Sequence, residues 1–317
     1  LVGKSFLQRS SLAGRYEGHE LLRQYAAEKL AESPADQAAA RDRHSAHYTA
    51  ALERFAVDLQ GPRQQDAVAE LEADSENARA AWEWAVAHGQ VERLDRAMEG
   101  LAHFYHRRVR YQEGEAAFRA AADRLMTEDV SGRRLRVAAR ALVWEAYFAR
   151  ALGRRELAAR LRQQSLALLE RPEVADQDTR AERALVYSHM GRAVYLSDYE
   201  RARTFLERSL ALYRALGDAW RTAAALHSLG TAALFRGAYT DARAAMEESQ
   251  EISRGLGDQE GIAWSMDDLT FVALHQGRFE EARRLARDAR AITQALGERE
   301  AIGFGLLAQA ASLAYLG

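Results

Sequence analysis

Residues 237–243 read Gly-Ala-Tyr-Thr-Asp-Ala-Arg, and residues 277–283 repeat this pattern 40 positions later as Gly-Arg-Phe-Glu-Glu-Ala-Arg. An earlier copy at 197–203 has the same form with Ser in place of the first Gly, and a weaker copy begins at Gly153. A fixed period of about 40 residues is typical of structural repeats in which each unit packs mainly on its neighbours. The chain is therefore expected to hold an array of such units.

Each unit is predicted to contain two helices. The triplet Leu-Gly-Asp at 216–218 returns at 256–258, and Leu-Gly-Glu follows at 296–298. Glycine is common just past the end of a helix because it enters the left-handed backbone conformation without a Cβ penalty. In one unit, this spacing predicts a first helix at about 218–235 and a second helix at about 239–253.

The spacing of small and aromatic residues is similar to a known repeat signature. Leu229 and Gly230 are followed by Gly237, Tyr239 and Ala242, which resembles the tetratricopeptide repeat (TPR). The next unit carries the same pattern at Leu269, Gly277, Phe279 and Ala282. The resemblance implies an α-solenoid of helix-turn-helix repeats, and units of about 40 residues resemble the TPR-like arms of bacterial MalT-type signal-transducing ATPases.

Composition agrees with helices and excludes several functions. The 317 residues include 44 Lys and Arg, 46 Asp and Glu, 3 Pro and no Cys. Ala, Leu, Arg and Glu dominate, so the fold class is expected to be all-α. The near-neutral charge argues against direct binding of nucleic acid, and the lack of Cys excludes thiol catalysis. No apolar run approaches the length of a membrane span, and a cytoplasmic location is expected.

No pattern predicts a catalytic residue or a metal site, so the chain is not expected to be an enzyme. Two histidine pairs, His44 with His47 and His103 with His106, each share one helix face. Two ligands do not complete a metal site, and these histidines are interpreted as polar residues on helix surfaces. A group of aromatic residues is interpreted as hydrophobic core: Trp82, Trp84, Phe104, Tyr105 and Tyr111.

The first part of the chain is organised differently. Residues 5–9 and 15–17 are predicted strands joined by a turn, and a helix follows from about His19 to Ala31. Strand, turn, strand and helix is how a winged-helix domain closes. Residues 1–34 are therefore expected to be the C-terminal part of such a domain.

Two further regions complete the expected organisation. Residues 35–130 are predicted to form a helical connector, with helices at about 37–60, 64–88, 91–107 and 111–125. Residues 131–317 are predicted to form the TPR-like repeats, the last of them truncated at Gly317.

A second resemblance concerns the N-terminal region. Residues 15–28 read Arg-Tyr-Glu-Gly-His-Glu-Leu-Leu-Arg-Gln-Tyr-Ala-Ala-Glu, which is similar to the winged-helix end of STAND-class ATPases, the NB-ARC, AfsR-like and MalT-like regulators. Residues 71–85 resemble the segment that joins that domain to the repeat arm in the same proteins. The resemblance implies that a nucleotide-binding domain, with its ATP or ADP, precedes residue 1. No cofactor is expected in this chain itself.

The same resemblance assigns a role to one histidine. In that family, the His of a Met-His-Asp motif reaches the β-phosphate of bound ADP and holds the closed state. The residues here are Gly18, His19 and Glu20, so His19 is implied to be the ADP phosphate sensor of the full-length protein. Gly18 departs from the family's Met, which puts the packing part of the motif in doubt.

The TPR frame also predicts a binding surface, because the first helix of each unit lines the concave face of a solenoid. Exposed aromatic residues often mark partner surfaces. The inward positions expected to form a ligand or partner groove are Tyr187, Tyr195, His227, Thr231, Phe235, Asp267, Phe271 and His275. The truncated end at Gly317 is expected to expose an apolar helix face through which copies of the chain self-associate.

The sequence therefore predicts a non-enzymatic sensor or protein-interaction arm of a bacterial STAND-type ATPase that acts in signal transduction or transcription regulation. Binding of an inducer, peptide or protein in the groove, and contact with the chain's own ATPase domain, would control oligomerisation of the ATPase. One alternative is a stand-alone TPR adaptor scaffold for protein complexes. A second alternative is a DNA-binding winged-helix regulator, against which the near-neutral charge argues.

Overall fold

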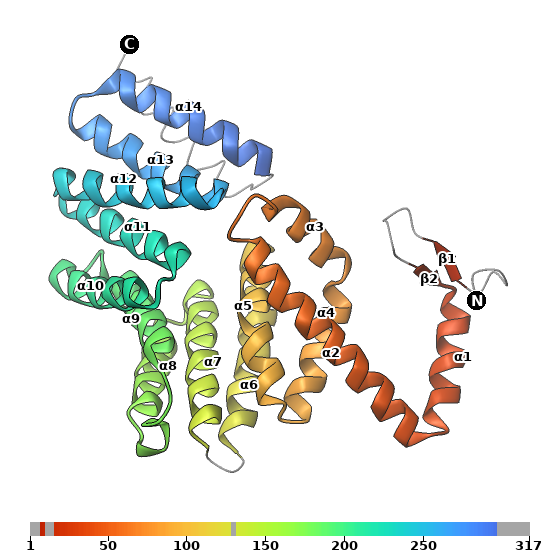
Figure 1. Ribbon diagram of the computed structural model, residues 1–317. Helices are drawn as coiled ribbons and strands as arrows, with labels where there is room; N and C mark the ends of the chain where they lie inside the picture. Colours follow the sequence, from red (N-terminus) through yellow and green to blue (C-terminus); the bar gives the residue numbers. More distant parts are fainter. Residues whose placement is uncertain (1–6, 10–15, 128–130, 297–317) are drawn as a thin grey trace.

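The computed structural model describes residues 7–9, 16–127 and 131–296, and this part of the chain is a curved array of helices preceded by a small β-ribbon (Figure 1). The expected all-α class and the helical repeats are confirmed. The predicted end of the array at Gly317 lies outside the described residues.

The elements follow one another along the chain with short connections. In order they are β1 (Leu7–Arg9), β2 (Tyr16–Gly18), α1 (Glu20–Ala31), α2 (Pro34–Asp58), α3 (Gln64–Ala73), α4 (Ser75–Ala87), α5 (Val91–Arg107), α6 (Tyr111–Met126), α7 (Gly132–Ala151), α8 (Arg155–Leu169), the 3₁₀ turn η2 (Pro172–Val174), α9 (Arg180–Val194), α10 (Tyr199–Leu216), α11 (Ala219–Arg236), α12 (Tyr239–Leu256), α13 (Gln259–His275) and α14 (Phe279–Leu296).

The described N-terminal elements match the two predicted strands and the helix, and the predicted turn between the strands lies outside the described residues. Strands β1 and β2 pair antiparallel, with Leu7 opposite Gly18 and Arg9 opposite Tyr16. Helix α1 begins directly after His19, whose Nδ1 accepts a hydrogen bond from the Leu21 amide at 3.3 Å. The ribbon and α1 lie at the outer edge of the array, and the end of α1 leads into the start of α2 (Figure 1).

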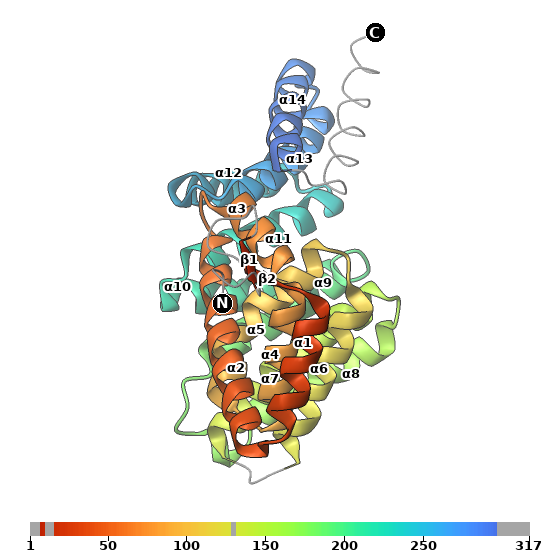
Figure 2. The same cartoon turned by 90° about the vertical axis from the view of Figure 1, so that its right-hand side faces the viewer.

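From α5 onward the chain forms successive helix pairs, α5 with α6 through α13 with α14. The first helices of the pairs, α5, α7, α9, α11 and α13, also pack on one another in sequence and make the inner face of the array. The second helices cover the outer face, as Figures 1 and 2 show from two sides. Each inner helix thus presents one side to the space enclosed by the curve.

A recurring buried serine fixes each outer helix on its inner partner. Ser165 of α8, Ser209 of α10 and Ser249 of α12 each donate a hydrogen bond to a main-chain carbonyl of the preceding inner helix, at 2.7, 2.8 and 2.8 Å. All three side chains are buried. A buried donor without a partner is costly, so this bond favours one position of the outer helix along the inner one.

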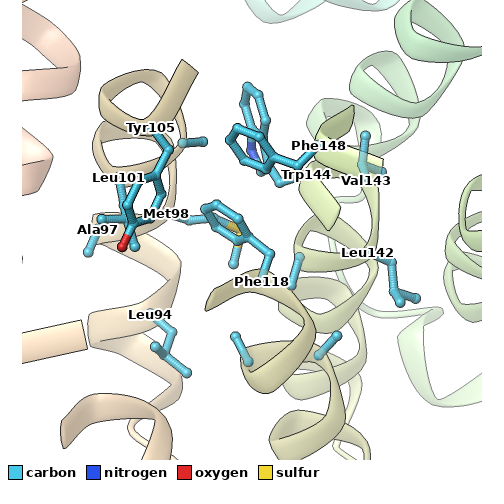
Figure 3. Close-up of a cluster of buried hydrophobic side chains, with 14 of the residues drawn as sticks. Leu94, Ala97, Met98, Leu101, Tyr105, Phe118, Leu142, Val143, Trp144 and Phe148 are labelled. Carbon is cyan, nitrogen blue, oxygen red and sulfur yellow. The ribbon is translucent and has the colours of Figure 1, made fainter. Parts of the chain in front are cut away.

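The largest core lies between α2 and α9, where aromatic rings stack between the helix pairs (Figure 3). The rings of Phe118 and Phe148 lie nearly parallel with centroids 5.8 Å apart, and Trp82 meets Phe118 edge-on at 5.5 Å. Of the aromatic residues predicted to form core, three are buried and two are half-buried. The buried ones are Trp82, Phe104 and Tyr105. Tyr111 packs against this core, whereas Trp84 stacks on His88 at 3.8 Å.

One predicted helix is wrong. Residues 64–88 form two helices instead of one, because the backbone leaves the helical conformation at Asp74 (φ −105°, ψ 8°). Asp competes with helical hydrogen bonding through its short side chain and is favoured where helices start. The break turns α3 away from α4 and brings the start of α3 towards the C-terminal repeats, as Figure 1 shows.

Val109 occupies the turn between α5 and α6 in a left-handed conformation, with φ 56°. It stands 44 residues before Gly153, which has φ 82° in the turn between α7 and α8. A left-handed conformation costs a side-chain-bearing residue roughly 1–2 kcal/mol, and a β-branched residue rarely adopts it. The same turn geometry thus recurs in this earlier helix pair without the glycine that marks it later in the sequence.

We predict that Val109→Gly raises the free energy of unfolding by about 0.5–1 kcal/mol. The gain is the relieved strain of roughly 1–2 kcal/mol less the extra backbone entropy of Gly in the unfolded chain. The matched change Gly153→Val should lower stability by a comparable amount, since only backbone strain opposes a Cβ at that open position. Urea unfolding measures both variants, and a Val109→Gly variant less stable than the parent would contradict the assignment.

Candidate functional site

A pocket of about 130 Å³ lies on the inner face of the array. Its walls come mainly from α5, α7, α9, α11 and α13, and Tyr213 of α10 and Leu59 at the end of α2 complete them. The residues that line it are Leu59, Glu99, His103, His106, Arg107, Trp144, Tyr147, Leu185, Ser188, His189, Arg192, Tyr213, Trp220, Arg221, Ala224, Glu260 and Trp264. The pocket therefore draws on both the connector and the repeats.

Aromatic rings form much of the wall. Three of the chain's five tryptophans, Trp144, Trp220 and Trp264, line the pocket. The ring of His103 lies between two of them, with centroids 5.5 Å from Trp144 and 5.3 Å from Trp220. His189 meets Trp144 edge-on at 5.5 Å on another side. Such a wall offers flat apolar faces and ring edges to anything that enters.

The histidines of the pocket are held neutral at physiological pH. Burial lowers the pKa of His103 to about 4 and that of His106 to about 3, and it lowers the pKa of His189 well below its ordinary value. The hydroxyl of Tyr147 lies 2.6 Å from Nδ1 of His106, which fixes that ring. The imidazoles thus contribute hydrogen-bonding groups and no charge.

The charged groups of the pocket are mostly paired. Arg221 contacts Glu99 at 3.0 Å, and Arg107 forms an ion pair with Glu260. Burial raises the pKa of Glu99, but Arg221 and Arg140 outweigh burial and lower it to about 2, so this carboxylate is ionised. Arg192 forms no ion pair within the described part of the chain. The lining therefore carries one cation in excess.

Two polar atoms of the wall lack hydrogen-bond partners within the described residues. The indole Nε1 of Trp144 is buried without an acceptor, and Oε1 of Glu99 is buried without a donor. The side chain of Trp144 is 5% exposed. Buried polar atoms are paired in the great majority of cases, so each unpaired atom in a pocket wall is a position for a ligand or solvent atom.

Contacts between distant parts of the chain close the array around the pocket. Gln64, at the start of α3, donates from Nε2 to Oδ1 of Asp258 at 2.6 Å and accepts from the amide of Glu260 at 3.4 Å. Glu260 in turn pairs with Arg107 at the end of α5. We call the set Gln64, Arg107, Asp258 and Glu260 the ring contact. The side chains of Gln64, Asp258 and Glu260 are buried, so the two ends of the curve meet in a fully formed polar interface.

The predicted groove residues lie next to the pocket rather than in it. Thr231 donates to Oδ2 of Asp268 at 2.6 Å, and His227 lies 3.2 Å from the same oxygen. Asp267 is buried beside them, and burial raises its pKa to about 7. The ring of His227 is 6.1 Å from that of Trp264, which joins this strip on α11 and α13 to the pocket.

The other predicted groove residues form separate ring pairs. Tyr195 and the exposed Phe235 lie 5.5 Å apart at the ends of α9 and α11, and His275 stacks on Tyr239 at 4.8 Å. Tyr187 stacks on Phe205 of the outer helix α10 at 6.2 Å, and Phe271 of α13 is half-buried. These rings do not meet in one cavity.

The interpretation of His103 and His106 as surface residues is wrong, because both line the pocket. For the pair His44 and His47, the interpretation as surface residues holds in part. His47 is exposed, whereas His44 is half-buried with its Nε2 3.3 Å from Oδ1 of Asn77. The described residues contain no group of three or more His, Cys, Asp or Glu side chains placed to hold a metal ion. The signal that sequence reading missed is the convergence of Trp and His on the inner helices.

Comparison with known protein families finds a match for part of the repeat array. Residues 221–295 match the tetratricopeptide repeat family. The match covers α11 to α14, the repeats with the clearest period. A comparison with curated protein sequences finds no match. In the described part of the chain, no helix has both the length and the apolar character needed to cross a membrane.

Two solved structures share the fold. BtubC from P. vanneervenii superposes with a TM-score of 0.52 at 18% identity, covering 74% of this chain and 91% of BtubC. A signal transduction ATPase with numerous domains (STAND) with a tetratricopeptide repeat sensor, from Pyrococcus horikoshii, gives 0.58 at 14% identity. That match covers 98% of this chain and 48% of the STAND protein, so the chain spans about half of it. At these identities the likeness shows the TPR solenoid and no activity.

The neutral pocket histidines predict a pH dependence of stability. The folded-state pKa of His103, about 4, lies below its ordinary value of 6.5, so the unfolded chain binds more protons between these pH values. The stability that neutral His103 contributes is complete above about pH 6.5 and is lost as the pH falls towards 4. The loss is at most about 1.4 kcal/mol per pH unit for one histidine.

We therefore predict that His103→Asn loses less stability than the parent when urea unfolding is compared at pH 6.5, 5.5 and 4.5. The control is His47→Asn, because His47 is exposed on α2 and solvated in both states. Parallel stability curves for the parent and His103→Asn would show that this ring becomes protonated without penalty.

The ring contact predicts a change of shape on mutation. Gln64→Ala removes the side-chain amide that bridges Asp258 and Glu260. We expect the free energy of unfolding to fall by about 1–3 kcal/mol and the curved helix array to open. Small-angle X-ray scattering should show a larger radius of gyration. Arg63→Gln is the control, because Arg63 makes only exposed ion pairs beside the same turn. An unchanged radius in the Gln64→Ala chain would mean that the ring contact does not hold the curve closed.

Proposed function

We propose that this chain is the non-enzymatic sensor and protein-interaction arm of a STAND-type ATPase, and that it binds its ligand in the space enclosed by the curve. The observation that carries the proposal is a pocket lined by residues from both sides of the ring contact, Arg107 on one side and Glu260 on the other. A STAND protein with a TPR sensor that has the same fold over 98% of this chain supports it.

The ring contact provides two states that a ligand can distinguish. Leu59 and Arg107 line the pocket from the N-terminal side of the closure, and Glu260 and Trp264 line it from the C-terminal side. A ligand that touches both sides prefers the closed array, whereas a larger partner that spreads the groove prefers the open one. A ligand shifts such an equilibrium only by its difference in affinity for the two states.

The N-terminal elements supply the proposed link to the ATPase. We propose that β1, β2 and α1 are the last part of a winged-helix domain that follows a nucleotide-binding domain. Leu21 and Tyr25, one turn apart on α1, are 67% and 58% exposed, and the preceding domain would cover them. His19 caps α1 through Nδ1, so Nε2 is the nitrogen that would reach the phosphate of ADP. In this role the chain works in the cytoplasm, and the closed or open arm controls oligomerisation and a transcriptional or other output.

A stand-alone adaptor is the second candidate function, and one observation favours it. The match covers 91% of the solved BtubC chain, so an array like this one makes up nearly all of that chain. An adaptor would use the same inner face to hold proteins together, without ADP, ATP or a winged helix. No observation of the structure favours the DNA-binding alternative.

The coding sequence upstream of Leu1 separates these functions. For the sensor arm we expect it to encode a strand followed by a Gly-x-x-x-x-Gly-Lys-Ser/Thr loop and a helix, and then a winged helix that runs into β1. A start codon shortly before Leu1, with no such domain, would leave the adaptor as the function of this chain.

A further inference from the structure

The pocket has a size, a lining and unpaired polar groups that together specify a class of ligand. Its volume of about 130 Å³ is close to that of a cavity of roughly 150 Å³ that holds one benzene ring. Trp144, His103 and Trp220 line it and pack edge to face on one another, so they form one continuous aromatic wall. A single aromatic ring fits both the volume and the walls, whereas a folded partner does not.

The charges of the wall favour an anion. Arg107 and Arg221 are neutralised by Glu260 and Glu99, and the neutral histidines add no charge. Arg192 of α9 remains without an ion pair in the described part of the chain. The buried indole N–H of Trp144 needs an acceptor, which an anionic oxygen supplies better than a neutral one.

A second polar group favours a donor on the same ligand. Oε2 of Glu99 lies 3.0 Å from Arg221 and 3.7 Å from Nε2 of His103, while Oε1 is buried without a donor. An ionised carboxylate oxygen in this position accepts an O–H or N–H bond strongly. Glu99 lies on α5 and Arg192 on α9, so the acceptor and the excess cation come from different walls of the pocket.

We propose that this pocket binds a small aromatic anion that carries an O–H or N–H donor as well as its anionic group. The ring packs against the wall that Trp144, His103 and Trp220 form, the anionic group meets Arg192 and the indole N–H of Trp144, and the donor meets Glu99. The inference rests on the proposed function, because it names the ligand class of the groove that the sensor arm uses.

Isothermal titration calorimetry with 4-hydroxyphenylacetate tests this ligand class. We expect the acid to bind at least about tenfold more tightly than its neutral amide, 4-hydroxyphenylacetamide, a difference of about 1.4 kcal/mol. Phenylacetate, which lacks the donor, should bind several-fold more weakly than the hydroxylated acid.

Variants locate the binding. Arg192→Gln should abolish the preference for the acid over the amide, and because Arg192 is exposed the variant should keep its fold. Trp144→Phe keeps an aromatic ring but removes the indole N–H, and it should weaken binding of the acid about tenfold. Arg201→Gln on the outer helix α10 is the matched control and should bind like the parent.

Equal affinity for the acid and the amide would overturn the charge assignment, and so would an Arg201→Gln variant as weak as Arg192→Gln. No heat with any of the three compounds up to about 10 mM would overturn the ligand class. These failures are distinct from failure of the proposed function, which the upstream coding sequence decides independently.

Discussion

The carboxylate of Asp258 holds the described array in its closed form. Its Oδ1 accepts from the Gly261 amide at 3.0 Å, which starts α13, and from Gln64 at 2.6 Å. Its Oδ2 accepts from the indole of Trp220 at 2.9 Å, which ties α13 to the preceding repeat. One buried carboxylate thus satisfies a helix start, a neighbouring repeat and a turn 194 residues earlier in the sequence. A buried carboxylate requires such partners, so the closure and the local helix start support each other.

The repeats were predictable because their information is local. Glycines at 217, 237 and 257 end helices in the left-handed conformation, and one helix lies between each glycine and the next. The earlier helix pair α5 and α6 was not recognised as part of the repeat pattern. Val109 adopts the left-handed conformation in its turn, where the later pairs have glycine. Likewise, the break at Asp74 follows from a single backbone position inside an otherwise helical stretch. Local patterns therefore predicted the clear repeats and missed the turns that no glycine marks.

The binding face was only half predictable. Sequence reasoning correctly chose the inner helices, but it placed the groove from their middle, at His227 and Asp267, to their C-terminal ends. The pocket instead uses the N-terminal halves of α11 and α13, at Trp220, Arg221 and Trp264. The reason is long-range, because the ring contact joins the first turn of α13 to α3 and encloses the space beside it. No repeat period encodes which half of a helix a distant turn will approach.

The enclosure also explains why the pocket can carry unpaired groups. Burial lowers the pKa values of His103 and His106 because the charged form loses its hydration. At His103, Glu99 opposes this effect, and Arg107 and Arg221 act in the same direction as burial. Ion pairs with Glu99 and Glu260 satisfy two of the cations, and these pairs also connect helices that are distant in sequence. The groups left over, a cation, an indole N–H and one carboxylate oxygen, are those that structural pairing does not need. They are the atoms that the proposed aromatic anion would contact.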